Sequence, residues 1–133
     1  MNQIQGEQLA AVYFTAWLEQ DEAAFLSVLH KDVRIEECDG AEYSGILECQ
    51  EWFRGWHEPG NKVLQWDILE SFFDAKEQTV SNVWRFTCLY DGKTSTFDGC
   101  SIISCSEEGI TRLREFAMKI EKYRPYPMSE VPD

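Results

Sequence analysis

Glu37 is the side chain whose position in this sequence best suits proton-transfer chemistry. It ends the segment VRIEE, which alternates as a β-strand does. Val33 and Ile35 are expected to face the core, and alternation places Glu37 on the same apolar face. Burial among apolar groups disfavours the charged carboxylate and raises its pKa, which suits a general acid or base near neutral pH. The alternative is that the strand ends at Glu37 and the carboxylate reaches solvent.

Large aromatic side chains are the second feature with chemical meaning. The 133 residues include five tryptophans, and tryptophan favours places where one edge stays accessible, such as a pocket mouth or an interface. The predicted pocket wall comprises Tyr13, Trp17, Trp52, Phe53, Trp56, Trp84 and Phe86. Asn82 shares the face of Trp84 and can offer an amide to the same pocket. Such a wall suits a flat apolar or aromatic ligand. Core packing is the alternative and is favoured for Phe53 and Trp56, although Trp56 stays among the candidate ligand-binding residues.

Cysteine and histidine residues give no support for a metal site or for nucleophilic catalysis. The five cysteines are an odd number without a C-x-x-C pair, which is typical of free thiols in a reducing cytosol. His30 and His57 follow predicted helices, where a helix-end role is expected. The N-terminal residues lack the basic and apolar regions of a secretory signal. We therefore predict no metal, no cofactor and a cytoplasmic protein.

Length and charge limit the possible partners. A chain of 133 residues corresponds to one domain, predicted over residues 1–120 and followed by a proline-rich tail at 121–133. Twelve basic against twenty-four acidic residues give a net charge of −12. So negative a surface repels nucleic acid and anionic lipid, and no apolar run is long enough to span a bilayer. The sequence therefore predicts neither a nucleic-acid partner nor a membrane partner.

The predicted pocket needs helices to cover it. Residues 7–20 form an amphipathic helix, Asp21 can cap a second helix over residues 22–30, and Gly45 begins a third helical segment that runs to His57. The apolar stripe of the first helix comprises Leu9, Val12, Tyr13, Ala16 and Trp17, and that of the third comprises Cys49, Trp52, Phe53 and Trp56.

From Lys62 onward the pattern is that of long β-strands. The strands are predicted at residues 62–73, 79–90, 94–105 and 110–119, with hairpin turns at Asp91-Gly92 and Glu108-Gly109. Helices followed by a meander of strands predict an α+β fold, with helices packed on one face of an antiparallel sheet. Both faces of the second long strand carry large apolar groups, so the other face is predicted to meet a second copy of the chain.

Several of these features together resemble the SnoaL-like and ketosteroid-isomerase-like branch of the NTF2-like superfamily. The matching segments are YFTAWLEQDEAAFLSVLHKDVRIEE, then SGILECQEWFRGWH, and late in the chain GITRLREF. The resemblance covers about 115 residues, nearly the whole chain. It implies a cone, in which a curved antiparallel sheet is closed by three helices around a hydrophobic pocket. It also implies a homodimer that meets through the sheet.

The resemblance also implies roles for particular residues. Glu37 takes the general-base position, although the isomerases have aspartate there, and Tyr13 takes the position of the tyrosine that binds the oxyanion. The second oxyanion donor of the isomerases is a protonated aspartate on the third long strand. Cys100 falls at that position here, and a shift of one or two residues would place Ser101 or Asp98 there instead. Without that donor, steroid isomerase activity is not expected.

Three hypotheses about function follow. The first is an enzyme that moves a proton without a cofactor, of the isomerase, cyclase or dehydratase type, on a small apolar carbonyl compound. The second is a binding protein with the same pocket and no working acid–base pair. The third is a dimeric assembly protein whose cone is filled by its own tryptophans. The candidate residues are Glu37 and Tyr13 for catalysis and Trp17, Trp52, Trp56, Trp84, Phe86, Asn82, Cys100 and Ser101 for ligand binding.

Overall fold

A computed structural model describes residues 1–128 of the chain. The helices in this range are α1 (Gln3–Glu19), α2 (Glu22–Ser27) and α3 (Gly45–His57). The strands are β1 (Leu29–Glu36), β2 (Glu42–Ser44), β3 (Lys62–Asp74), β4 (Thr79–Tyr90), β5 (Lys93–Ser106) and β6 (Gly109–Met118). The α+β class is confirmed. Three N-terminal helices are not, because α2 has only six residues and α3 follows two strands.

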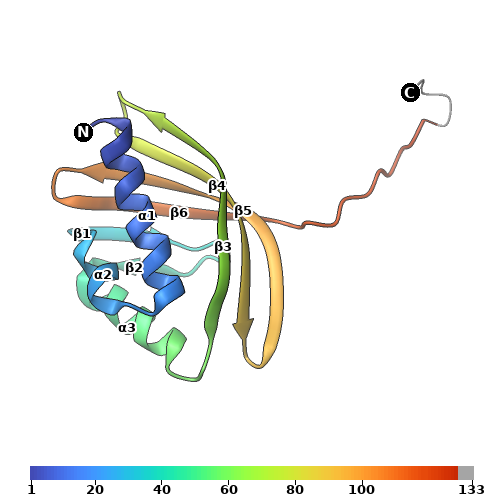
Figure 1. The fold of residues 1–133 in the computed structure, drawn as a ribbon, viewed down its shortest axis with the longest axis horizontal. Helices are drawn as coiled ribbons and strands as arrows, with labels where there is room; N and C mark the ends of the chain where they lie inside the picture. Colours follow the sequence, from blue (N-terminus) through green and yellow to red (C-terminus); the bar gives the residue numbers. More distant parts are fainter. Residues whose placement is uncertain (129–133) are drawn as a thin grey trace.

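The strands form one sheet in the order β2-β1-β6-β5-β4-β3. The sheet is curved and unclosed, with β2 and β3 at its edges, and Figure 1 shows it bending around the side that carries the helices. Neighbouring strands are antiparallel except β1 and β6, which pair in parallel. The prediction of a wholly antiparallel sheet is therefore wrong at this pair. Alternation within a strand reports which face its side chains take and carries no information on the direction of its neighbour.

The junction between α2 and β1 also differs from the prediction. The helix expected to reach residue 30 ends at Ser27, and β1 begins at Leu29. The backbone N–H of Ile110 donates to the carbonyl of Val28 at 2.8 Å, and Leu29 pairs with Ile110 across the sheet. Pairing with β6 therefore takes these residues from the helix. At its other end β1 stops at Glu36, so Glu37 lies one residue beyond the strand.

Local signals at the helices are confirmed in part. The Asp21 side chain accepts a hydrogen bond from the Ala24 backbone N–H at 3.0 Å, so Asp21 does cap α2. The buried face of α1 carries Tyr13 and Trp17 as expected. It also includes Phe14, whereas Val12 is 39% exposed. The apolar stripe of α1 is therefore rotated slightly from the predicted one.

The two faces of the sheet have different surroundings. On the face that packs against the helices, Trp84 and Cys88 of β4 are buried. On the opposite face, large apolar side chains are exposed: Phe72 on β3 and both Phe116 and Met118 on β6. The hairpin between β4 and β5 turns through Asp91 and Gly92, both with positive φ, as the Asp-Gly signal predicts.

Beyond β6, residues 119–128 form neither helix nor strand, and Figure 1 shows this segment leaving the body of the protein. The last part of the predicted tail, residues 129–133, lies outside the described residues. None of the helices in the described range has the length and apolar character needed to cross a membrane.

Gly99 of β5 leaves the space that the Trp84 ring occupies. The two residues face each other across β4 and β5. A Cβ at position 99 would lie 2.4 Å from the Trp84 ring and 2.3 Å from the carbonyl oxygen of Phe116. The Phe116 carbonyl belongs to the backbone of β6 and cannot move aside as a flexible side chain can. Any larger residue at position 99 therefore forces the Trp84 indole and β6 to shift.

We predict that Gly99→Ala lowers the free energy of unfolding by about 1–3 kcal/mol through overpacking. Urea denaturation measures the change. Gly55→Ala is the matched control, because a Cβ there meets nothing within 4 Å and Gly55 lies in α3; this variant should gain stability, by roughly 0.8–1 kcal/mol. Equal effects of the two substitutions would contradict the close packing at Gly99.

Candidate functional site

A cavity of about 180 Å³ lies between the helices and the sheet. Seven of the predicted site residues line it: Tyr13, Trp17, Glu37, Trp52, Trp56, Trp84 and Phe86. Seven further lining residues are Cys38, Val63, Trp66, Cys88, Tyr90, Phe97 and Glu115. The cavity therefore draws on α1, α3, all four long strands and the turn after β1.

Aromatic rings that pack against one another form most of the wall. The ring centroids of Trp17 and Trp52 are 4.7 Å apart, and those of Trp17 and Trp56 are 5.5 Å apart. On the sheet side, Trp66 meets Trp84 edge to face at 5.5 Å. Phe53 is buried beneath Trp17 and does not line the cavity, as the core interpretation expected. Because each ring is held by others, the wall is preorganised.

Glu37 is held in place by the backbone of a tight turn. Its N–H donates to the carbonyl of Ala41 at 2.8 Å, and its carbonyl accepts from Gly40 at 3.0 Å. Burial raises the pKa of its carboxyl group to about 7, and the charge of Asp39 adds to the rise, while Tyr43 opposes it. The half-buried carboxyl group lines the cavity, so it does not simply extend into solvent.

Glu115 of β6 is a second carboxyl group at the cavity, and it was absent from the predicted site. Burial, followed by the negative charge of Glu37, raises its pKa to about 8, and the Ser101 hydroxyl partly opposes the rise. Ser101 Oγ donates to Glu115 Oε2 at 3.3 Å and accepts from the indole N–H of Trp84 at 2.9 Å. Alternation from buried Leu113 places Glu115 on the inner face, so the reasoning applied to Glu37 would have identified it.

The two carboxyl groups interact electrostatically, because each charge disfavours ionisation of the other. In residues 1–128, neither Glu37 nor Glu115 forms an ion pair with a basic side chain. Basic residues on these strands pair on the outer face instead: Arg112 Nε lies 2.7 Å from Glu36 Oε1. Two such carboxyl groups titrate as a pair, and burial favours the protonated form of both.

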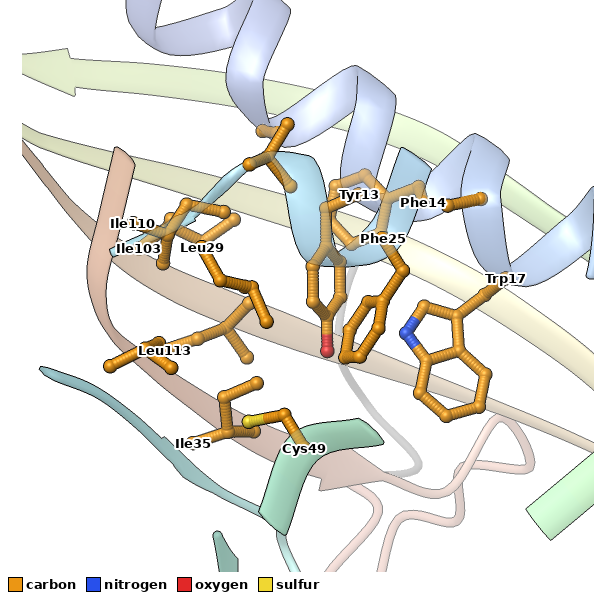
Figure 2. Close-up of a cluster of buried hydrophobic side chains, with 14 of the residues drawn as sticks. Tyr13, Phe14, Trp17, Phe25, Leu29, Ile35, Cys49, Ile103, Ile110 and Leu113 are labelled. Carbon is orange, nitrogen blue, oxygen red and sulfur yellow. The ribbon is translucent and has the colours of Figure 1, made fainter. Parts of the chain in front are cut away.

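Tyr13 places a hydroxyl group beside this pair. The side chain is fully buried, and its hydroxyl group has no hydrogen-bond partner within the described part of the chain. Burial raises the pKa of Tyr13 well above its ordinary value, and the charges of Glu115 and Glu37 raise it further. Figure 2 shows the ring descending from α1 beside Phe25, with the hydroxyl group at the end away from the helix.

Two indole N–H groups add to the unpaired donors at the cavity. The ring nitrogens of Trp17 and Trp66 are buried without a hydrogen-bond partner in the range that the structure describes. Buried polar groups in proteins are nearly always paired. The Trp17 side chain also interacts with the Tyr13 hydroxyl group, which lowers the pKa of Tyr13, so both indoles and the phenol are polar groups of the cavity wall.

The remaining predicted residues do not line the cavity. Cys100 points to the outer face, opposite Val83 and Phe116. Asp98 is on the same outer face, where its carboxylate pairs with Arg85 at 2.8 Å. Ser101, one residue from Cys100, faces inward and reaches the cavity through its bond to Glu115. Thus Ser101, of the three alternatives, faces the site.

Asn82 is on the inner face, as alternation predicted, but it lies away from the cavity. It is buried, and its amide donates to the Ser71 hydroxyl group of β3 at 2.8 Å. Its amide group therefore joins β3 to β4 at the far end of the sheet.

The sequence matches the SnoaL-like domain over residues 10–113. The chain belongs to the SnoaL-like family. This family is part of the NTF2-like superfamily, as the motifs in the sequence indicated. No protein with a curated function matches the chain.

Solved structures with the same fold include three that bear different names. A candidate polyketide cyclase from Xanthomonas campestris pv. campestris has a TM-score of 0.76 and 18% identity, covering 87% of this chain and 92% of its own. An LEH-like epoxide hydrolase from M. tuberculosis has a TM-score of 0.76 and 14% identity, covering 86% of this chain and 84% of its own. A protein with a ketosteroid isomerase-like fold from Catenulispora acidiphila, in complex with trimethylamine, has a TM-score of 0.72 and 13% identity, covering 84% of this chain and 85% of its own. At these identities the likeness shows the fold alone.

Metal-binding side chains are not gathered in this SnoaL-like protein. Over residues 1–128, no group of three or more His, Cys, Asp or Glu side chains is placed to hold a metal ion. The polar groups that line the cavity are carboxyl, phenol, indole and thiol groups.

We predict that Glu115→Gln becomes more stable relative to the wild-type protein as pH rises from about 5 to about 8. Between its ordinary pKa of 4.5 and the folded value of about 8, Glu115 keeps a proton that the unfolded chain has released. Wild-type stability therefore falls with rising pH across this range, and glutamine removes the contribution of Glu115. Urea denaturation at several pH values measures the difference.

Glu36→Gln is the contrasting control. The hydrogen bond from Arg112 lowers the pKa of Glu36, so its carboxylate stabilises the folded state above the unfolded pKa and ceases to do so on acidification. This variant should lose stability at neutral pH and little in acid. A parallel pH dependence for the two variants would contradict the burial of Glu115.

Proposed function

We propose that this protein binds a small organic molecule in the cavity and catalyses proton transfer on it without a cofactor, as isomerases, cyclases and dehydratases do. The substrate is a small, largely apolar carbonyl compound. The observation that supports this most is the pair Glu37 and Glu115, two carboxyl groups with raised pKa values of about 7 and 8 beside an unpaired tyrosine hydroxyl group. The names of the cyclase and hydrolase neighbours also favour a small organic ligand.

Each residue has a distinct role in the proposed reaction. Ionised Glu37 removes a proton from the carbon next to the carbonyl group, and the electron pair moves to the carbonyl oxygen. Tyr13 and protonated Glu115 donate hydrogen bonds to the resulting oxyanion. Glu37 then returns the proton to carbon. Glu115 thus acts as the second oxyanion donor in this proposal. Cys100 cannot take that role, because it lies on the outer face.

The size of the cavity limits the substrate. Its volume of about 180 Å³ lies below the roughly 300–1,000 Å³ typical of sites for drug-sized ligands. A one- or two-ring compound suits this space better than a steroid. Trp17, Trp52, Trp56, Trp84 and Phe86 supply the apolar contacts.

We predict that the protein accelerates exchange of the α-hydrogens of 2-indanone with deuterium in D₂O, measured by NMR. This exchange needs only the proposed removal and return of a proton, so the natural substrate need not be known. Glu37→Gln should slow it by about 10²–10⁴-fold, and Tyr13→Phe by about 10²–10³-fold. The rate should be highest between pH values of about 7 and 8, because Glu37 must be ionised and Glu115 protonated.

The control is Glu36→Gln, whose carboxylate lies on the outer face with Arg112. It should exchange 2-indanone at the wild-type rate. Unchanged exchange in Glu37→Gln would remove Glu37 as the base and leave the second hypothesis, a non-catalytic binding protein, as the better one.

We further propose that the protein is a homodimer that meets through the outer face of the sheet. The exposed apolar side chains Phe72, Phe116 and Met118 lie on this face, with exposed fractions of 51–57%. An apolar sheet face of this kind is usually covered by another surface. A dimeric assembly role without catalysis would use the same face.

We predict that Phe116→Glu converts the dimer into a monomer, as measured by light scattering after size-exclusion chromatography. A buried unpaired charge at the dimer interface opposes association. Leu47→Glu is the matched control, because Leu47 is 77% exposed on α3, away from this face, and the variant should stay dimeric. A wild-type monomer would contradict the proposal.

A further inference from the structure

The charged groups at the cavity are all of one sign. The lining residues include two glutamates and neither lysine, arginine nor histidine. The whole chain carries a net charge of −12, so the surrounding field is negative as well. An anionic ligand would place its negative charge beside two carboxyl groups that have no basic partner among the lining residues. The site therefore excludes anions and favours neutral or cationic molecules.

The cavity wall offers the faces and edges of many aromatic rings. Trp56 meets Trp17 at 84° with centroids 5.5 Å apart, and the Tyr90 ring centroid lies 6.2 Å from that of Trp56. Trp52 is stacked on Tyr43 at 4.4 Å and 10°. An organic cation within about 6 Å of several ring centroids is attracted to their electron-rich faces. The lining of the cavity combines aromatic rings with two carboxyl groups, and both kinds of group attract an organic cation.

We propose that the cavity binds a small organic cation, a tertiary or quaternary ammonium compound, with Glu37 and Glu115 as the counter-charges and the tryptophan rings as the cage. The inference rests on the proposed function in one respect, that this cavity is the ligand site. The Tyr13 hydroxyl group also supports it, since it is fully buried and has no hydrogen-bond partner among residues 1–128. Its oxygen can accept a hydrogen bond from a tertiary ammonium N–H. One carboxylate then balances the cation and the other remains free to move a proton.

A matched pair of ligands separates this inference from binding of a neutral molecule. Choline and 3,3-dimethyl-1-butanol have the same shape and differ in the positive charge. Both are titrated into the wild-type protein, with binding followed by calorimetry and by tryptophan fluorescence. Choline should bind at least about tenfold more tightly than the alcohol.

The pH dependence of binding gives a second signature. A cation favours ionised carboxylates, so choline affinity should rise as pH increases from about 6 to about 9, whereas binding of the alcohol should change little. The titratable groups that face Glu37 and Glu115 are Tyr13, Cys38, Asp39 and Tyr43. The pKa values of the two tyrosines and of Cys38 are raised, so these groups stay neutral over most of the range.

Substitutions assign the effect to the two carboxyl groups. Glu37→Gln and Glu115→Gln should each weaken choline binding by about tenfold and leave the alcohol unaffected. Glu36→Gln, on the outer face, should bind both ligands as the wild-type protein does. If a glutamine variant fails to fold, the wild-type comparison of choline with the alcohol still decides.

The outcomes are distinct. Tighter binding of choline, increasing with pH, supports the inference. Equal or weaker binding of choline while the alcohol binds would overturn the inference and keep the cavity as a ligand site. Binding of neither ligand would overturn the inference and count against the proposed function as well.

Discussion

The chemistry of this SnoaL-like protein depends on two carboxyl groups placed in one apolar cavity without a basic partner. Desolvation is the main cause of the raised pKa of both Glu37 and Glu115, and the charge of Glu37 adds to the pKa of Glu115. A basic side chain beside them would restore two ordinary carboxylates. The described residues that line the cavity include no lysine, arginine or histidine, so neither carboxyl group has a basic neighbour there to lower its pKa.

Arg85 and Arg112 lie on the outer face of the sheet, away from the two carboxyl groups of the cavity. Arg112 pairs with Glu36 and Arg85 with Asp98, both on the side of the sheet away from the helices. Exposed pairs of this kind contribute roughly 0–1 kcal/mol to stability. These pairs matter here because of where they lie. Side chains alternate along β6, so Arg112 and Arg114 point to the outer face, whereas Leu113 and Glu115 point to the inner face.

The aromatic packing gives the cavity its shape and holds the carboxyl groups in position. Trp84 fits against Gly99 and donates to Ser101, which donates in turn to Glu115. Glu37 is fixed differently, by the backbone hydrogen bonds of the turn after β1. The position of Glu115 thus depends on side-chain packing across three strands, whereas that of Glu37 depends on a local turn.

The sequence by itself determined the features that arise from local periodicity and from short motifs. Alternation in VRIEE placed Glu37 toward the core, and the motifs indicated the family. Helical spacing placed Tyr13 and Trp17 on one helix face, and Trp52 and Trp56 on another. Only the tertiary structure decided which residues meet across the sheet. The parallel pairing of β1 with β6, the inward side chain at Ser101 in place of Cys100, and the proximity of Glu115 to Glu37 all depend on strand register. β1 pairs with β6 across more than seventy residues of sequence, and a one-residue shift in the pairing of β5 would exchange the faces of Cys100 and Ser101.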